Sequence, residues 1–361
     1  MRQLHSVAGA SQAAAEAPSA PNGGVGGGLD ILGQCMGACR DKPGTVVFPD
    51  SLDERVLQAA RQLKEQGLAE PVLVASPFAV RRKMQESGIH SAGLTVVDYS
   101  SQSLLQRNAE DFMSIRKQKG KPISREEAEK AMQCPLAASA LMVRRGEVEV
   151  GVGGNLSSTA NILRTGLAII PLSPGIKTVS SLFLMLSPTG DKQFVFADCA
   201  VVPEPSADTL ADIAIASAEK ARNLLQQEPR VAMLSFSTKG SADHPRAELV
   251  RAAVDKVRER APDLLIDGEL QFDAASVPAV SALKAPGSII EGKANVFVFP
   301  SLEAGNIAYK MVQRLADYKA VGPFLQGFDG GWHDLSRGCS SRDIFEAAVL
   351  GICMQRGSLL N

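Results

Sequence analysis

Short apolar runs alternate with longer amphipathic stretches along most of the chain, and this alternation limits the possible folds more than any other feature. The runs predicted to form buried strands are 45–48, 72–74, 148–152, 195–197, 231–234, 264–266 and 296–299. Between many of them apolar residues recur at helical spacing, notably over 208–225, 246–260 and 305–316. Strands that alternate with helices form mostly parallel sheets covered by helices. The sequence therefore predicts an α/β fold.

The stretch after the first predicted strand carries the clearest helix signals. Ser51 and Glu54 have the spacing of a capping box, which closes the first turn of a helix. Apolar residues then recur at helical spacing, at Val56, Leu57, Ala60 and Leu63. Gly67 is expected to end this helix. The most apolar run, 181–186, is far shorter than a bilayer span and is predicted to be a buried strand or helix.

The length of 361 residues fits two domains better than one core. Residues 1–28 are rich in Ala, Gly, Ser and Pro and end in a glycine run, which is typical of a disordered tail and linker. They lack the long apolar segment of a secretory signal, and an organelle transit peptide would be richer in arginine. Two interpretations of residues 1–28 remain open: a short docking segment, or a tail without function.

Composition and the length of the apolar runs exclude two classes of partner, nucleic acid and membrane. Lys and Arg number 38 against 39 Asp and Glu, so the net charge of -1 offers no basic field for nucleic acid. Aromatic residues make up 5% of the chain, too few for base-stacking platforms. No apolar run is long enough to span a membrane. We expect a cytoplasmic globular protein that binds neither nucleic acid nor membrane.

The six cysteines are too scattered for a disulfide framework; they are Cys35, Cys39, Cys134, Cys199, Cys339 and Cys353. Cys35 and Cys39 have a spacing that metal sites use, but neither a second pair nor a nearby His completes a site. We therefore expect reduced, mostly structural thiols in an intracellular protein, and no metal.

Polar segments that directly follow strands are the candidate sites, because ligands of open α/β sheets lie beyond the carboxyl ends of strands. The first such segment, 153–164, combines glycines with the run Ser157, Ser158 and Thr159, which can cap a helix whose N-terminal amides attract an anion. Arg164 lies about two turns into that helix. Two interpretations fit this segment: a phosphate-binding site, or ordinary helix capping beside an exposed arginine. The segment is not a P-loop, because no Gly-Lys-Ser/Thr follows the glycines.

The second segment, 267–275, contains Asp267, Glu269 and Asp273. Three carboxylates so close together could bind a metal, cap the next helix or pair with arginine. We favour structure or substrate positioning over metal binding.

The third segment, 333–343, is polar, is punctuated by glycine and leads into an apolar helix, as active-site loops often do. Ser340 is expected to be the N-cap of that helix, which places Asp343 in its first turn. A plain capping box is the alternative interpretation.

Together these segments resemble a known family. The stretch from about residue 41 to the end closely resembles phosphate acetyltransferases, and most of all the type found in ethanolamine-utilising bacteria. The resemblance rests on six blocks in the same order, namely 154–164, 267–275, 292–296, 299–310, 322–327 and 334–340.

The resemblance implies a fold akin to that of the isocitrate/isopropylmalate dehydrogenases, with two α/β domains and an active-site cleft between them. The first domain would comprise 29–175 plus 325–361, and the second 176–324. The resemblance also implies a homodimer. Coenzyme A would be a substrate, and no cofactor would be tightly bound.

The resemblance also implies roles for individual residues. The catalytic Ser-Arg pair of the family corresponds to Ser336 and Arg337, and its catalytic Asp to Asp343. Two arginines that bind phosphate and coenzyme A correspond to Arg164 and Arg116. The remaining residues implied to bind substrate are Ser157, Ser158, Thr159, Asn306, Tyr309, Lys310 and Gln326.

The implied reaction is reversible transfer of an acetyl group between coenzyme A and inorganic phosphate. In the thioester-forming direction a thiolate attacks acetyl phosphate in a ternary complex, and Asp343 would take the thiol proton. Ser336 would donate a hydrogen bond to the developing oxyanion rather than act as a nucleophile. Arg164 and Arg337 would hold the phosphate, whose shape and charge suit guanidinium groups.

Other functions remain open on sequence alone. Propionyl or butyryl transfer differs from acetyl transfer by one or two methylenes, which change selectivity modestly. A dehydrogenase of the related fold would need a nucleotide-binding G-x-G-x-x-G after a strand, and none is present. A non-catalytic regulatory domain would not need Ser336, Arg337 and Asp343. The tail over 1–28 could address the enzyme to a bacterial microcompartment.

Overall fold

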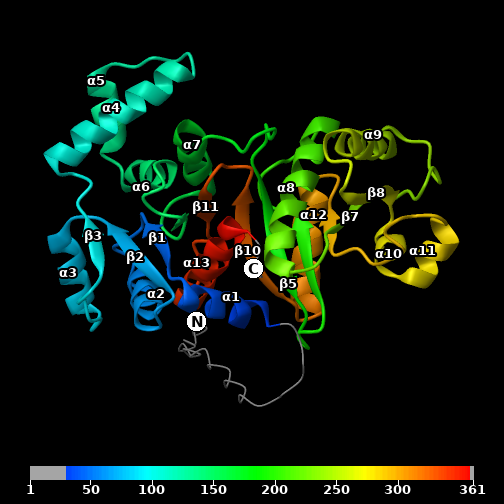
Figure 1. Cartoon of the computed structure of the whole chain (residues 1–361), viewed down its shortest axis with the longest axis horizontal. Helices are drawn as coiled ribbons and strands as arrows, with labels where there is room; N and C mark the ends of the chain where they lie inside the picture. Colours follow the sequence, from blue (N-terminus) through cyan, green and yellow to red (C-terminus); the bar gives the residue numbers. More distant parts are fainter. Residues whose placement is uncertain (1–29, 358–361) are drawn as a thin grey trace, which may run out of the picture.

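The computed structural model describes residues 30–357, so the tail predicted over 1–28 lies outside the described residues. Within 30–357 the chain forms two sheets that lie side by side, each flanked by helices (Figure 1). The predicted α/β fold is confirmed. None of the helices in 30–357 has the length and hydrophobicity needed to cross a bilayer.

The first sheet consists of parallel strands in the order β11-β4-β1-β2-β3. Their bounds are β1 Gly44–Phe48, β2 Ala69–Val74, β3 Thr95–Val97, β4 Val150–Gly153 and β11 Gly331–Asp334. From β1 the chain steps outward through β2 and β3, and it then returns to the other side of β1 with β4 and β11. The strand order thus reverses between β1 and β4, and α/β sheets bind ligands beyond the carboxyl ends of strands at such a reversal.

The second sheet is mixed, in the order β10-β5-β6-β9-β7-β8. Its strands are β5 Ser180–Leu186, β6 Gln193–Ala197, β7 Arg230–Leu234, β8 Leu265–Leu270, β9 Val296–Val298 and β10 Lys319–Gln326. β5 pairs antiparallel with β10 and β6, and the remaining pairs are parallel.

Helices cover both faces of each sheet. One face of the first sheet packs against α1 Ile31–Asp41, α2 Glu54–Glu65, α3 Pro77–Glu86 and α13 Ser341–Arg356. Its other face packs against α4 Gln102–Gln118, α5 Arg125–Met132, α6 Pro135–Arg144 and α7 Thr159–Ile169. The second sheet lies between α8 Ala207–Leu225 with α9 Pro245–Arg260 and, on the opposite face, α10 Phe272–Ser276, α11 Pro278–Lys284 and α12 Leu302–Leu315.

Helix α13 links the two sheets. It packs on α1, α2 and β4 on one side and on α8 and β10 on the other. Its buried Glu346 accepts hydrogen bonds from Lys319 of β10 (2.6 Å) and from Arg342 (2.9 Å), so the buried charge is paired across the two sheets. The helix that carries Asp343 is therefore fixed by both halves of the molecule.

Each strand predicted from an apolar run is present, and the run 181–186 forms β5. The predicted helices over 208–225, 246–260 and 305–316 correspond to α8, α9 and α12. β8 continues to Leu270, so Asp267 and Glu269 lie within the strand rather than after it.

The capping box predicted for Ser51 and Glu54 is wrong. Asp53 is the N-cap of α2, and its side chain accepts a hydrogen bond from the N–H of Arg55. Ser51 is buried instead, where its hydroxyl donates to the carbonyl of Phe48 (2.5 Å) and accepts from the N–H of Val74 (2.7 Å). An Asp nearer to the helix outcompetes a Ser, because both side chains are good caps and position decides.

Candidate active site

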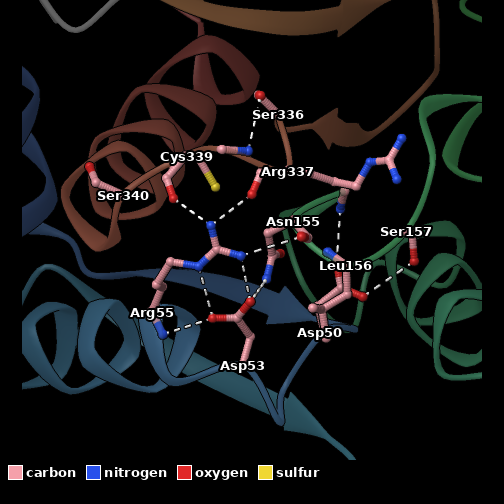
Figure 2. A network of polar contacts seen from close by, with 12 residues as sticks. Asp50, Asp53, Arg55, Asn155, Leu156, Ser157, Ser336, Arg337, Cys339 and Ser340 are labelled. Atoms are coloured by element: carbon pink, nitrogen blue, oxygen red, sulfur yellow. Dashed lines mark hydrogen bonds and ion pairs between the residues drawn. The ribbon is translucent and has the colours of Figure 1, made fainter. Parts of the chain in front are cut away.

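Three loops meet at the carboxyl ends of β11, β4 and β1, the adjacent strands around the reversal. The β1–α2 loop supplies Asp50 and Asp53, the β4–α7 loop supplies 154–158, and the β11–α13 loop supplies 335–340. Because the three strands are parallel neighbours, their loops leave the same edge of the sheet. Figure 2 shows the loops joined by a network of hydrogen bonds. This network is the candidate active site.

The carboxylate of Asp50 shapes the β4–α7 loop. Its Oδ2 accepts hydrogen bonds from the N–H groups of Gly154 (3.0 Å) and Leu156 (3.3 Å). Its Oδ1 accepts one from the hydroxyl of Ser157 (3.3 Å). Asp50 is buried, and these donors offset the cost of burying its charge. Ser157, predicted to bind substrate, is thereby held in place.

Arg55, in the first turn of α2, contacts all three loops (Figure 2). Its Nη1 donates to the backbone carbonyls of Arg337 (2.8 Å) and Cys339 (2.6 Å). Its Nη2 donates to the carbonyl of Asn155 (3.3 Å) and to Asp53 (2.7 Å), and its Nε donates to Asp53 at 3.0 Å. One guanidinium therefore ties the turn after β11 to the loops after β1 and β4.

Asp53 anchors this guanidinium and also accepts a hydrogen bond from the side-chain amide of Asn155 (3.0 Å). Burial alone would raise the pKa of Asp53, but the hydrogen bonds from Arg55 and Asn155 outweigh burial and lower it. The same ion pair raises the pKa of Arg55 above its usual value. Both groups stay charged at neutral pH, so the connection persists.

Residues 336–339 form a tight turn between β11 and α13. The N–H of Gly338 donates to the hydroxyl oxygen of Ser336 (3.2 Å), and the N–H of Cys339 donates to the carbonyl of Ser336 (2.9 Å). Ser336 and Arg337 are exposed, and the side chain of Arg337 points away from Arg55 (Figure 2). The two residues predicted to be catalytic therefore face solvent from a fixed turn.

The first turn of α13 contains the capping box expected for Ser340 and Asp343. The N–H and the hydroxyl of Ser340 both donate to Oδ2 of Asp343 at 2.8 Å. In return the N–H of Asp343 donates to the hydroxyl oxygen of Ser340 (3.2 Å). Within residues 30–357 no hydrogen bond reaches the other oxygen, Oδ1, so the cap leaves one carboxylate oxygen of this exposed residue available.

Helix α7 begins where the first polar segment places it. Ser158 is its N-cap and accepts a hydrogen bond from the N–H of Asn161 (3.3 Å). Arg164 donates to the side-chain oxygen of Asn161 (2.9 Å) and is exposed. The N-terminus of α7 and the guanidinium of Arg164 thus lie on one short stretch of chain. Together they favour the binding of an anion there.

Asp334, the last residue of β11, is a buried carboxyl group beside Gly154. Thr159 donates a 2.5 Å hydrogen bond to its Oδ2, while its Oδ1 is buried without a partner among residues 30–357. A Cβ on Gly154, whose φ is +100°, would come within 2.2 Å of that Oδ1. Burial, opposed by the Thr159 hydrogen bond and helped by the charge of Asp50, raises the pKa of Asp334 to about 6.

Arg116 lies in the last turn of α4, half-buried. Nearby Lys119 donates to the carbonyls of Leu167 (2.7 Å) and Ala168 (3.1 Å) near the end of α7. Burial, together with the charges of Arg144 and Arg116, lowers the pKa of Lys119. Lys119, three residues after Arg116, therefore contacts the C-terminal part of α7, whereas Arg164 is the central residue of that helix.

The other residues predicted to bind substrate belong to the second sheet and its helices. On α12, Asn306 donates to the carbonyl of Cys199 (3.0 Å) and accepts from Lys310 (2.7 Å). The ring of Tyr309 stacks on Phe183, with centroids 4.1 Å apart. In the described residues no hydrogen bond joins these side chains to the turn at 336–339.

Gln326, at the end of β10, is 1% exposed. Its amide nitrogen donates to the hydroxyls of Ser180 and Ser217, each at 2.9 Å. Gln326, predicted to bind substrate, therefore lies in the interior, where its amide joins β5 to α8.

The carboxylates of the second polar segment pair with cations. Asp267 accepts from Arg258 (3.1 Å), and Glu269 accepts from Arg251 (3.0 Å), as the structural interpretation expects. Asp273 pairs with Lys284 (2.7 Å). Residues 30–357 contain no group of three or more His, Cys, Asp or Glu side chains arranged to hold a metal.

Three residues of the network lie outside the segments singled out from sequence, namely Asp50, Asp53 and Arg55. Asn155 and Asp334 lie within those segments, but no role was assigned to them. Asp50 and Asp53 directly follow a predicted strand, so the criterion that selected 153–164 also points to them. Arg55 carries no such signal, because an arginine in the first turn of an amphipathic helix usually faces solvent. Its role depends on contacts with residues almost three hundred positions away.

Residues 30–352 match the family model of phosphate acetyl/butaryl transferases. The chain is 42% identical over 334 residues to a phosphate acetyltransferase of Clostridium acetobutylicum, in an alignment that covers 91% of this chain and 100% of that protein. It is 43% identical over 305 residues to the phosphate acetyltransferase of Bacillus subtilis, covering 84% and 93% of the two chains.

Solved structures agree with these relatives. A phosphotransacetylase from Streptococcus pyogenes superposes with a TM-score of 0.85 at 39% identity, covering 90% of this chain and 97% of that one. The EutD phosphotransacetylase from Staphylococcus aureus superposes with a TM-score of 0.82 at 37% identity, covering 90% and 98%. A structure assigned as 4-hydroxythreonine-4-phosphate dehydrogenase from Salmonella typhimurium, 12% identical with a TM-score of 0.51, shares the fold, which is the isocitrate dehydrogenase-like fold. The chain therefore belongs to the phosphate acetyl/butaryl transferase family.

Proposed function

We propose that this site transfers an acetyl group reversibly between coenzyme A and inorganic phosphate, with Ser336, Arg337 and Asp343 as its catalytic residues. Membership of the family, with 42% and 43% identity to phosphate acetyltransferases, makes the protein an acyltransferase of that activity. The assignment of residues to steps rests on the geometry of the three loops.

The thiol of coenzyme A needs a base, because a simple thiol has a pKa of about 8.5. Asp343 is suited to take its proton, since the capping box engages Oδ2 and leaves Oδ1 available. The resulting thiolate attacks the carbonyl carbon of acetyl phosphate, and negative charge builds on the carbonyl oxygen. When this tetrahedral intermediate collapses, the bond from carbon to the phosphate oxygen breaks and inorganic phosphate leaves. Ser336 can stabilise that charge, because its oxygen accepts from Gly338 and its own O–H is left to donate.

Phosphate would bind between the turn and α7. Arg337 and Arg164 are exposed guanidinium groups that suit a dianion, and the N-terminus of α7 adds the positive end of a helix dipole. Ser157, Ser158 and Thr159 build that N-terminus through their contacts with Asp50, Asn161 and Asp334. We assign Arg116 and the α12 residues Asn306, Tyr309 and Lys310 to coenzyme A binding.

The observation that carries this proposal is the meeting of three loops at the strand-order reversal, with Ser336 and Arg337 exposed on a fixed turn. The direct test incubates the protein with coenzyme A and acetyl, propionyl or butyryl phosphate and follows thioester formation. We expect acetyl-coenzyme A to form fastest, with slower propionyl transfer, because one methylene is worth about 1–3 kcal/mol. Absence of thioester, or a preference for butyryl phosphate, would contradict the assignment.

We further propose that the enzyme is of the ethanolamine-utilisation type and that residues 1–28 address it from the cytoplasm to a microcompartment. The similarity to the EutD protein and the glycine-rich linker after a short terminal segment support this. A fluorescent reporter fused to residues 1–28 should form foci in cells that assemble microcompartments. A diffuse signal beside a correctly localised control cargo would oppose the targeting role.

We propose that the protein is a homodimer that uses α12. Ile307, Met311 and Leu315 lie four residues apart on one face of this helix and are 58%, 53% and 78% exposed. Ala304, Ala308 and Val312 pack against the core of the second sheet, whereas within the described residues nothing covers the face with Ile307, Met311 and Leu315. The double variant Met311→Glu with Leu315→Glu should sediment as a folded monomer. A monomeric wild type would contradict the dimer.

We also keep the two-domain division as a proposal, with 29–175 plus 325–361 around the first sheet and 176–324 around the second. The strands of the first sheet fall within the first part, and β5 to β9 fall within the second. Limited proteolysis that cuts near residues 176 and 324 and yields a stable fragment over 176–324 would support it, whereas degradation without such a fragment would oppose it.

A further inference from the structure

The guanidinium of Arg55 has no N–H group left for a ligand. An arginine carries five N–H donors, one on Nε and two on each Nη. Nε donates to Asp53, Nη1 to the carbonyls of Arg337 and Cys339, and Nη2 to Asp53 and the carbonyl of Asn155. A basic side chain at this edge of the sheet would ordinarily be taken for a phosphate ligand, but these contacts exclude that use.

The contacts of Arg55 fall on both sides of Gly338. The carbonyls of Arg337 and Cys339 both accept hydrogen bonds from Nη1 of Arg55, at 2.8 and 2.6 Å. Because both carbonyls must point at this one nitrogen, the backbone conformation between them is fixed. Two bonds inside the turn, from Gly338 and Cys339 to Ser336, complete it. The exposed side chains of Ser336 and Arg337 leave from this backbone, so their direction depends on it.

The anchor of Arg55 is itself rigid. Asp53 caps α2 and binds two guanidinium nitrogens, and it also receives the amide of Asn155. The side chain of Asp53 is 8% exposed, compared with 32% for that of Arg55. A lysine could not reproduce these contacts, because a single ammonium lacks the planar fork.

We propose that Arg55 is a positioning residue for acyl transfer, which holds the turn at 336–339 so that Ser336 and Arg337 reach the substrate, without touching the substrate itself. The inference rests on the proposed function. Helices α2 and α13 also pack through buried apolar side chains such as Leu57, Leu63 and Ile344, so the core beneath the site has contacts that do not involve Arg55.

The test compares Arg55→Lys with the matched control Arg61→Lys on the same helix. Arg61 also pairs with a carboxylate, Glu65 (2.7 Å), and also donates to two backbone carbonyls, those of His90 (3.3 Å) and Ala92 (2.8 Å), but away from the three loops. Arg55→Lys should lower kcat about 100-fold, because displacing catalytic groups by about 1 Å typically costs that much in rate. KM for both substrates should stay within about threefold of the wild-type value. Arg61→Lys should retain wild-type kcat.

A second variant separates positioning from mere stability. In a Ser336→Ala background, Arg55→Lys should lower kcat by a smaller factor than in the wild type, because part of what Arg55 positions is already missing. The inference would be overturned if Arg55→Lys lowered kcat by the same factor in both backgrounds. It would also be overturned if Arg55→Lys changed KM alone, or if its loss of kcat matched its loss of folded protein. Full activity of Arg55→Lys beside an active wild type contradicts the role of Arg55 alone, whereas an inactive wild type contradicts the proposed function as well.

Discussion

The hydroxyl of Thr159 donates a 2.5 Å hydrogen bond to the carboxyl group of Asp334, and so joins the first residue of α7 to the last residue of β11. Asp50 holds the same loop from the other side through the N–H of Gly154. Two carboxyl groups therefore flank one glycine at the strand-order reversal, with unequal numbers of donors. Asp50 accepts three hydrogen bonds, whereas one oxygen of Asp334 is buried without a partner in the described residues.

This asymmetry predicts a pH-dependent stability difference for Asp334→Asn. The pKa of Asp334 is raised to about 6, so the folded state favours the protonated form. The stability linked to that proton is present below pH 3.8 and is lost as the pH rises through about 6. Relative to wild type, Asp334→Asn should therefore gain stability between pH 4 and 7, by at most about 3 kcal/mol.

Urea unfolding at several pH values measures this difference. The exposed Asp329, five residues earlier, provides the control, and Asp329→Asn should show no comparable trend. A stability difference between Asp334→Asn and wild type that is constant with pH, or that has the opposite slope, would show that the carboxyl group is ionised throughout.

Ser336→Ala removes the proposed donor to the oxyanion. We expect kcat to fall roughly 100- to 1000-fold, because this contact is made in the transition state, with KM and the melting temperature nearly unchanged. Steady-state kinetics and a thermal melt check both parts. Near-normal turnover in the folded variant would remove Ser336 from the mechanism.

Arg164→Ala should mainly raise KM for acetyl phosphate, because an exposed guanidinium that suits a dianion is lost. Arg164→Lys should restore part of the affinity, since a point charge replaces the planar fork. Arg82→Ala, which removes an exposed arginine paired with Glu86 on α3, serves as the control and should leave KM unchanged. If coenzyme A binding alone weakens, Arg164 belongs to the other substrate.

A chain that begins at Leu29 should keep full activity, because it retains the whole of α1 and its N-cap, Asp30, which accepts from Gly33 (3.0 Å). A chain that begins at Lys42 should lose stability, since α1 buries Ile31 and packs Cys39 on Cys353 of α13 with a sulfur separation of 4.0 Å. Burying one such isoleucine is worth about 1.5–3 kcal/mol. Equal melting temperatures for the two chains would show that α1 adds nothing to the core.

The fold and the core of the site differ in how far the sequence determines them. The strand signals arise from local runs such as 231–234, where periodicity and burial coincide, and these predictions are confirmed. The Ser340 cap was equally predictable, because a capping box spans only four consecutive residues. The Ser51 cap was not, because a competing Asp lies two residues away and the tertiary contact with Val74 claims the serine.

Long-range contacts explain what the sequence left out. The function of Arg55 depends on carbonyls in a turn at the far end of the chain, and backbone carbonyls carry no side-chain signature. The raised pKa of Asp334 likewise depends on burial beside Gly154 and on Asp50, which come from three separate segments. Local patterns identify segments that bear chemistry, whereas the strand order decides which of them meet.

The most direct test of the central claim, acyl transfer with Asp343 as the base, is the pH–rate profile of acetyl-coenzyme A formation for wild type beside Asp343→Asn. The variant keeps a side chain that can accept from the N–H of Ser340, so the start of α13 should persist. Without a base it should lose activity steeply near pH 7 and recover part of it as the pH approaches the thiol pKa of about 8.5, because solvent then supplies the thiolate. A variant with the wild-type profile and wild-type kcat would contradict the claim and leave Asp343 as a capping residue.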